Sequence, residues 1–179
     1  MTHEELLANT SFFADTPTSA LSLICAQAKT QNLQRGDVLF NEGDAPDALF
    51  VVLSGRIAIA IGNKPLDSRE SMLALMESGD LFGELGMLDE GPRSAMARAI
   101  EQSSVLRIPY AQVREQMQAN PTMLWGVIKL LATRLRTMDE VLADSVFLDV
   151  TGRTAKRLLE LSSGNSEFVL PVTQEELAG

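Results

Sequence analysis

Residues 82–95, with the sequence FGELGMLDEGPRSA, carry side chains whose types and spacing suit the binding of an anion. Gly83 and Gly86 lack a Cβ, so they permit tight turns and let peptide N–H groups come close to a ligand. Arg93 adds a permanent positive charge in a planar fork that matches phosphate oxygens, and Ser94 adds a hydroxyl donor. These groups predict an anion site within one short stretch of chain.

The same stretch offers a second site, for hydroxyl groups. Glu84 is only an acceptor when ionised, so it suits sugar hydroxyls and not phosphate. Leu85, Met87 and Leu88 are expected to form one short helical turn whose free N–H groups face the anion. Together the two sites describe a small phosphorylated sugar, above all a nucleotide. The alternative is an ordinary Gly-rich β-turn with a surface Arg and a surface Glu.

The chain around this stretch must hold it in place, and its pattern predicts helices followed by a β-rich region. Residues 3–31 are expected to be mostly helical, with Phe12 and Phe13 as packing residues. Short apolar segments then alternate with turns marked by Gly-Asp pairs, and residues 63–71 are expected to form an exposed hairpin tip. The predicted strands are Val38–Phe40, Leu49–Leu53, Ile57–Ile61, Met72–Met76 and Val105–Ile108. Many short strands with regular turns imply an antiparallel barrel or jelly roll.

A long amphipathic helix is predicted after Pro121, preceded by a short one over residues 110–118. Six of its apolar residues step alternately by four and three, and we call them the seam: Leu124, Ile128, Leu131, Leu135, Met138 and Leu142. A second apolar face, formed by Trp125, Val127 and Leu130, suits packing against the barrel. The two faces predict a homodimer along the seam. The alternative is a monomer whose helix lies on its own barrel.

Composition limits the classes of protein to which the chain can belong. Its 179 residues are 45% apolar and include no apolar run of membrane-spanning length, so we expect a soluble protein with no membrane partner. The N-terminus lacks the basic start and apolar core of a signal peptide, which favours a cytoplasmic location. One cysteine, Cys25, and one histidine, His3, argue against an iron–sulfur, haem or zinc site. No metal site is predicted, and Cys25 is expected to pack in the core.

Residues 82–95 closely resemble the phosphate-binding cassette of cyclic-nucleotide-binding domains, especially those of the bacterial cyclic-AMP receptor (catabolite activator) family of transcription regulators. We call these residues the cassette. Residues 147–153, FLDVTGR, resemble the hinge of that family between its sensor and DNA-binding domains. The helix that carries the seam matches the family's dimerisation helix without a gap. The resemblance covers about the whole chain, with both motifs in the family's order and separation.

The resemblance implies an α+β fold and three parts. An antiparallel β-roll (a double-stranded, jelly-roll-like barrel) flanked by helices would occupy residues 1–120, with the cyclic-nucleotide site. A long C-terminal dimerisation helix would occupy residues 121–147. Residues 148–179 would hold the hinge and the start of a winged helix-turn-helix domain, with a helix over 150–161, a strand over 168–170 and a capping box over 173–176.

In the family, that capping box opens the first helix of the helix-turn-helix, and the DNA-recognition helix follows it. Here the chain stops at Gly179, so we interpret it as truncated within the DNA-binding domain. The full-length parent would then bind DNA, and this chain would not. A net charge of −9, from 15 basic and 24 acidic residues, fits that interpretation because no basic surface is visible.

The resemblance also assigns roles to single residues. Arg93 would pair with the cyclic phosphate, helped by Ser94 and by the N–H of Ala95. Glu84 and the Gly83 backbone would hold the ribose hydroxyl. Arg134 would pair with Glu84 or the phosphate, and Leu73 and Leu85 would flank the base. The remaining expected contacts are Phe82, Gly86, Met138 and Asp139.

The sequence departs from the family where the best-known members place Thr-Ser to hold the adenine amino group. Met138 and Asp139 stand there, and the Met138 thioether is a poor hydrogen-bonding group. Asp139 can accept hydrogen bonds from the amine of adenine or from the N–H and amine of guanine. The alternative to this ligand-binding role is that Asp139 is a solvated charge beside the seam. Cyclic AMP is therefore the expected ligand, with cyclic GMP, another effector, or no ligand at all as alternatives.

These expectations combine into a cyclic-nucleotide-sensing, homodimeric transcription regulator that is not an enzyme. Ligand binding would reposition its DNA-binding domains by allostery. Two other classes of protein share part of this pattern. An enzyme could use Glu84, Asp89 and Glu90 for acid–base chemistry, but no nucleophile or metal cluster accompanies them. A regulatory module of a kinase or channel would share the cassette but not the hinge.

Overall fold

The computed structural model describes residues 2–61 and 71–147, and its first 130 residues form one compact unit. The expectations for residues 148–179, which include most of the hinge, the helix, the strand and the capping box, lie outside the described residues. So does nearly all of the predicted hairpin tip, at 63–70.

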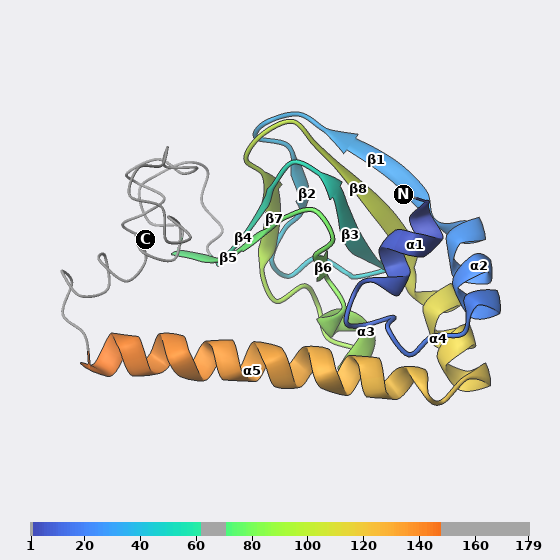
Figure 1. Ribbon diagram of the computed structural model, residues 1–179. Helices are drawn as coiled ribbons and strands as arrows, with labels where there is room; N and C mark the ends of the chain where they lie inside the picture. Colours follow the sequence, from blue (N-terminus) through green and yellow to red (C-terminus); the bar gives the residue numbers. More distant parts are fainter. Residues whose placement is uncertain (1, 62–70, 148–179) are drawn as a thin grey trace, which may run out of the picture. The chain divides into compact units, whose positions relative to one another are not determined.

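Two four-stranded antiparallel sheets form the β-roll (Figure 1). The first sheet contains, in spatial order, β1 (Lys29–Leu33), β8 (Ser103–Pro109), β3 (Ala48–Ser54) and β6 (Leu81–Phe82). The second contains β2 (Val38–Phe40), β7 (Met96–Ala99), β4 (Ile57–Ile61) and β5 (Ser71–Met76). All neighbouring strands pair antiparallel. The predicted α+β fold with an antiparallel roll is confirmed.

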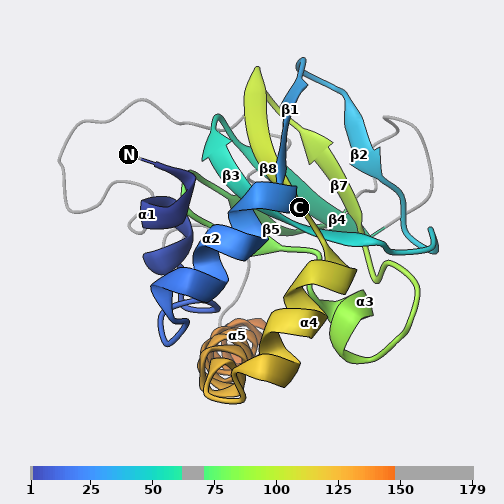
Figure 2. The same cartoon turned by 90° about the vertical axis from the view of Figure 1, so that its right-hand side faces the viewer.

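The helices of the compact unit pack beside the first sheet. Figure 2 shows α1 (His3–Ala8), α2 (Thr18–Gln27) and α4 (Tyr110–Ala119) together on one side of the strands. The short helix α3 (Leu85–Leu88) follows β6, and α5 (Met123–Phe147) follows α4. The predicted helix over residues 110–118 and the predicted turn at 85–88 are therefore confirmed.

Strand β3 is buried on both faces, which explains its unbroken run of apolar residues. Phe50 and Val52 belong to the core between the two sheets. Leu49 and Val51 point the other way and belong to the core between the first sheet and the helices. Phe12 and Phe13 are buried in that second core, as predicted, and Cys25 packs against it.

The same four-residue turn closes the chain at three places, and each contains one of the Gly-Asp pairs that predicted turns. In residues 34–37, 41–44 and 77–80, the final Asp carboxylate accepts the N–H of the first residue, at 2.8, 2.7 and 2.8 Å. The glycine before each Asp has a φ of +92°, +85° or +95°, as the third position of a type II turn requires. Local chemistry thus sets these turns.

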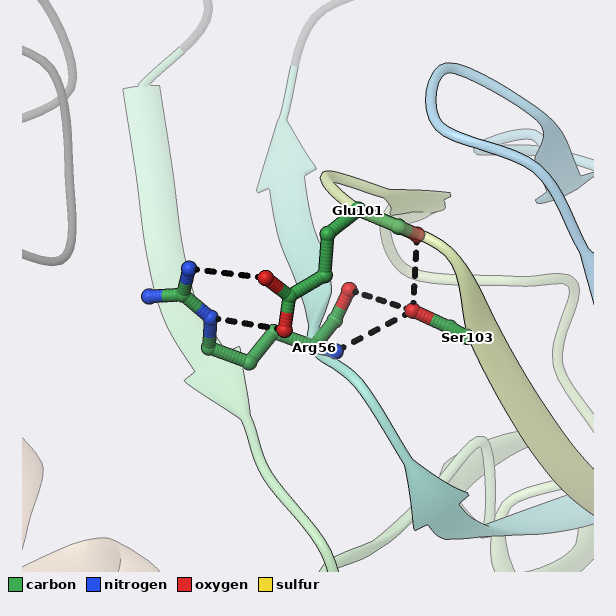
Figure 3. A network of polar contacts seen from close by, with 3 residues as sticks. All are labelled: Arg56, Glu101 and Ser103. Atoms are coloured by element: carbon green, nitrogen blue, oxygen red, sulfur yellow. Dashed lines mark hydrogen bonds and ion pairs between the residues drawn. The ribbon is translucent and has the colours of Figure 1, made fainter.

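A polar network joins the two connections that cross between the sheets at one end of the roll (Figure 3). Arg56, which follows β3, donates from Nε and Nη2 to the two carboxylate oxygens of Glu101, both at 3.0 Å. Glu101 lies between β7 and β8, and the hydrogen bonds from Arg56 lower the pKa of its carboxyl group. The Ser103 hydroxyl accepts the Arg56 N–H at 3.1 Å, so both crossings are tied together.

Three strands of the structure, β1, β6 and β7, were not predicted from the sequence. Residues 29–31 were expected to be helical, but they belong to β1, which pairs along its length with β8. Residues 29–32 are polar and exposed, so they show no alternation of apolar residues. Strand β6 has only two residues, and β7, with the sequence MARA, contains no β-branched or aromatic residue.

The first turns of α5 pack tightly against the compact unit. Met123 and Val127 are buried there, and Leu130 packs against the same core. A Cβ on Gly126 would lie 2.2 Å from the carbonyl oxygen of Phe12. Packing of Val127 and Leu130 was predicted correctly, but the prediction for Trp125 was wrong, because its side chain is 62% exposed.

The seam residues of α5 are all exposed, with exposed fractions from 38% at Leu131 to 65% at Met138.

In the part of the chain that the structure describes, no helix has the length and apolar character needed to cross a membrane. No group of His, Cys, Asp and Glu residues there gathers as a metal site.

Candidate functional site

The cassette begins in β6, passes through α3 and ends just before β7. At its start, Gly83 has a φ of +77°, and a Cβ there would lie 2.7 Å from Nη1 of Arg93. A Cβ on Gly86 would lie 2.5 Å from Cγ of Pro46. Both positions need glycine for close approach, but the groups that approach are an arginine and a proline of the protein itself. The predicted approach of a ligand to these glycines stays a prediction.

Arg93 lies inside the protein, with an exposed fraction of 5%. Its Nη1 donates to the carbonyl oxygen of Gly83 at 2.8 Å and to the hydroxyl of Tyr110 at 2.9 Å. Its Nη2 donates to the carbonyl oxygen of Ala48 at 2.7 Å. The Phe40 ring lies under the guanidinium, with its centroid 4.1 Å from Cζ. Two strands, the cassette and a helix therefore hold one side chain.

The electrostatic environment of Arg93 is unusual because its hydrogen-bond acceptors within the described residues are all uncharged. Its Nε is buried and has no hydrogen-bond partner there. Burial lowers the pKa of the Arg93 guanidinium, and Tyr110 and Asp47 oppose that shift. Asp47 itself is exposed and forms an ion pair with Arg107. Because arginine keeps its proton at any ordinary pH, the site contains a buried cation with an unused donor.

Glu84 is fully buried, with an exposed fraction of 0%. It stands directly before α3, and its carbonyl oxygen accepts the N–H groups of Met87 at 2.9 Å and Leu88 at 3.2 Å. A buried carboxylate and a buried guanidinium therefore come from the same fourteen-residue cassette. Neither group lies on the surface, which excludes the alternative of a β-turn with a surface Arg and a surface Glu.

The other predicted site residues differ in their surroundings. Ser94 is exposed, Ala95 is buried, and Leu85 is 37% exposed. Phe82 is buried between the sheets and stacks on Phe50 with a centroid distance of 5.5 Å. Leu73 lies in β5, and Arg134, Met138 and Asp139 lie on α5 beyond residue 130. All twelve predicted ligand contacts stay predictions.

The groups that hold Arg93 were not predicted from the sequence. Tyr110 was assigned only to a helix, although it is the one tyrosine of the chain and follows Pro109 at the start of α4. The Ala48 carbonyl and the Phe40 ring come from β3 and β2, which lie far from Arg93 in the sequence and reach it through strand pairing. A backbone carbonyl has no signature in the sequence, so only Tyr110 offered a signal that could have been used.

Helix α4 is bonded to the cassette at two points. The Tyr110 hydroxyl donates to the carbonyl oxygen of Gly83. One turn further on, Nη2 of Arg114 donates to the carbonyl oxygen of Met87 at 2.8 Å. The second bond satisfies a carbonyl at the end of α3, where a cation is favourable. The cassette and α4 therefore form one connected polar unit.

Comparisons with known proteins agree with this geometry. Residues 30–120 match the family model of the cyclic nucleotide-binding domain. The chain is 33% identical over 182 residues to the CRP-like cAMP-activated global transcriptional regulator of Mycobacterium tuberculosis, with 98% of this chain and 80% of that relative covered. The chain therefore belongs to the cyclic nucleotide-binding domain family, within the transcription regulators of the catabolite activator type.

Solved structures support the same assignment. The catabolite activator protein of Thermus thermophilus is 30% identical and superposes with a TM-score of 0.64, covering 94% of this chain and 78% of that one. The c-di-GMP responsive global regulator CLP of Xanthomonas campestris is 25% identical with a TM-score of 0.73, covering 90% and 83%. These relatives are transcription regulators and not enzymes, so the resemblance stated from the cassette and hinge is confirmed.

Proposed function

We propose that the chain senses cyclic AMP as part of a homodimeric, cytoplasmic transcription regulator. Arg93 binds the cyclic phosphate, with Ser94 and the Ala95 N–H, and Glu84 with the Gly83 backbone binds the ribose hydroxyl. The proposed organisation has three parts: a sensing domain over residues 1–120, a dimerisation helix over 121–147, and the hinge with the start of a DNA-binding domain over 148–179.

One observation carries this proposal. The Arg93 guanidinium is buried against uncharged acceptors, and its buried Nε has no hydrogen-bond partner within the described residues. An unsatisfied buried donor costs about 1–3 kcal/mol, so its persistence calls for a role. A desolvated cation without a hydrogen-bonded carboxylate binds an anionic ligand strongly, because little charge is already neutralised. The buried Glu84 nearby in sequence supplies the acceptor that a sugar needs.

Cyclic AMP is the proposed ligand because the mycobacterial relative is cAMP-activated. Two observations support an alternative effector. Met138 and Asp139 replace the residue types expected to hold adenine, which favours testing cyclic GMP. The Xanthomonas relative responds to c-di-GMP, so related regulators differ in their ligands.

Calorimetric titration of the dimeric protein with cyclic AMP and cyclic GMP tests the proposal. We expect binding of cyclic AMP, and a loss of about 3–5 kcal/mol in Arg93→Leu because a phosphate charge loses its partner. Arg35→Leu is the matched control, since it removes the same charge from an exposed turn and should leave affinity unchanged. Equal binding by Arg93→Leu and the parent would sink the proposal.

The proposed allostery concerns the chain beyond the sensing domain. Ligand binding would change the packing of the two seam helices and so reposition the DNA-binding domains of the full-length parent. A ligand acts this way only through different affinities for the two arrangements. Hydrogen exchange over residues 134–153 should therefore change on addition of nucleotide, and identical protection would contradict the coupling.

A further inference from the structure

The Tyr110 hydroxyl lies between two parts of the proposed ligand site. It accepts a hydrogen bond from Nη1 of Arg93 at 2.9 Å and donates to the carbonyl oxygen of Gly83. We propose that Tyr110 is a positioning residue for the phosphate: it fixes the Arg93 guanidinium so that the ligand meets a preorganised donor edge. This inference rests on the proposed function and adds to it a residue that touches the ligand only through Arg93.

Tyr110 is itself held firmly, as a positioning residue must be. Its side chain is 6% exposed and belongs to the core between the first sheet and the helices. Its N–H donates to the carbonyl oxygen of Asp47 at 2.9 Å, at the point where β8 passes into α4. The position of the hydroxyl is therefore set by the strand–helix junction and not by the cassette.

The guanidinium that Tyr110 contacts is fixed on several sides. Nη1 and Nη2 have acceptors, and the Phe40 ring covers one face. Tyr110 provides the only side-chain acceptor among the hydrogen bonds that the described residues make to Arg93. Nε is the nitrogen that these partners leave unused. These three hydrogen bonds use three of the five N–H groups of the guanidinium, so they orient it while the described residues leave Nε–H and one N–H of Nη2 for an anion.

The chemistry of a phenol suits this task better than that of a carboxylate. Burial raises the pKa of the Tyr110 hydroxyl above its ordinary value, so the group stays neutral at physiological pH. A neutral acceptor orients the guanidinium without cancelling its charge, whereas a carboxylate would compete with the phosphate for the same cation. Tyr110 can therefore fix Arg93 and still leave the full charge for the ligand.

Loss of the hydroxyl has a definite expected effect. In Tyr110→Phe the guanidinium keeps two backbone acceptors but loses the one anchored in α4. Ordering the guanidinium then becomes part of the cost of binding. We expect the Kd for cyclic AMP to rise about five- to thirty-fold, the size of a lost hydrogen bond to a charged group after allowance for its indirect action.

The test compares three ligands by calorimetry with the parent protein and with Tyr110→Phe. The ligands are cyclic AMP and its two phosphorothioate diastereomers, in which sulfur replaces one or the other exocyclic phosphate oxygen. Sulfur accepts hydrogen bonds more weakly than oxygen, so a fixed guanidinium makes the parent prefer one diastereomer. In Tyr110→Phe that preference should shrink several-fold, because the guanidinium no longer has one orientation. A general loss of protein stability would instead reduce the affinity for all three ligands equally.

Thr10→Val is the matched control, since it also removes one buried hydroxyl, which donates to the carbonyl oxygen of Leu7 at 2.8 Å. It should change neither the Kd nor the preference. Any of four results would overturn the inference: unchanged or tighter binding of cyclic AMP by Tyr110→Phe, an equal loss of affinity for all three ligands, no preference between the diastereomers in the parent, or failure of Tyr110→Phe to fold. If the parent binds no cyclic nucleotide, the proposed function fails and this inference fails with it.

Discussion

A buried guanidinium normally requires a carboxylate partner, because desolvation of a charge costs several kcal/mol. Arg93 is instead stabilised by two backbone carbonyls, one phenol and the faces of aromatic rings, among which Phe40 lies nearest. Cation–π contacts of this kind contribute roughly 1–2 kcal/mol when desolvated. The arrangement keeps the charge inside the protein without neutralising it, which is the property that an anion site needs.

Tyr110 is the only tyrosine of the chain, so its ionisation can be followed directly by tyrosinate absorbance. Burial raises its pKa, and the charge and hydrogen bond of Arg93 act in the opposite direction. We therefore expect a midpoint above the ordinary value of about 10 in the parent, and a still higher midpoint in Arg93→Leu. A lower midpoint in Arg93→Leu would contradict the contact between the two side chains.

The same shift affects stability at high pH. The folded-state pKa of Tyr110 is raised, so the unfolded chain releases this proton first as the pH increases. The stability that the protonated Tyr110 contributes is thus fully present below about pH 10, and it is lost as the pH rises through the folded-state pKa. Circular dichroism recorded during the titration separates ionisation of the folded protein from unfolding.

At this scale the sequence predicted the groups of the cassette better than their partners. The need for glycine at Gly83 followed from residue type, but the complete burial of Glu84 did not. The Ala48 carbonyl and the Phe40 ring did not, because strand pairing that joins distant segments brings them to Arg93. Tyr110 could have been suspected only from its place beside Pro109.

Among the elements, the start of α5 makes one backbone contact that leaves no room for a side chain. A Cβ on Gly126 would lie 2.2 Å from the Phe12 carbonyl oxygen, so Gly126→Ala forces the helix and the loop apart. Such overpacking costs up to about 3 kcal/mol, while the better helix propensity of alanine returns about 1 kcal/mol. We expect Gly126→Ala to lower the free energy of unfolding by about 2 kcal/mol in urea denaturation.

The exposed Ala132 of the same helix provides the control. Ala132→Gly should also destabilise, by about 1 kcal/mol, because there the helix propensity acts without a packing term. The two opposite substitutions, Gly126→Ala and Ala132→Gly, are thus both expected to lower the free energy of unfolding. Stabilisation by Gly126→Ala would show that the loop at Phe12 moves away at little cost.

The elements that the sequence predicted are those whose signal is local. The Gly-Asp turns contain their own hydrogen bonds, and β3 is a continuous apolar run. Strand β1 has neither feature: the sequence KTQNL becomes a strand only because β8 offers it a paired edge. Tertiary pairing overrides a weak local preference in this case.

At the scale of the whole molecule, the seam gives α5 an unusual surface. Its six apolar residues are each 38–65% exposed and recur at heptad spacing along the helix. A stripe of this kind is typical of a coiled-coil interface and is costly to leave in water. It supports the proposed homodimer, in which the same stripe of a second copy covers it.

The dimer can be tested by placing a charge on the seam. Leu135 is 61% exposed in the single chain, so Leu135→Glu should fold normally but put a carboxylate into the interface. We expect sedimentation to give a dimer for the parent and a monomer for Leu135→Glu at micromolar concentration. Thr133→Glu adds the same charge to an exposed position of the helix away from the seam and should remain dimeric. A parent that sediments as a monomer would mean that the seam covers another surface, and dissociation by both variants would mean that charge alone, and not the seam, governs assembly.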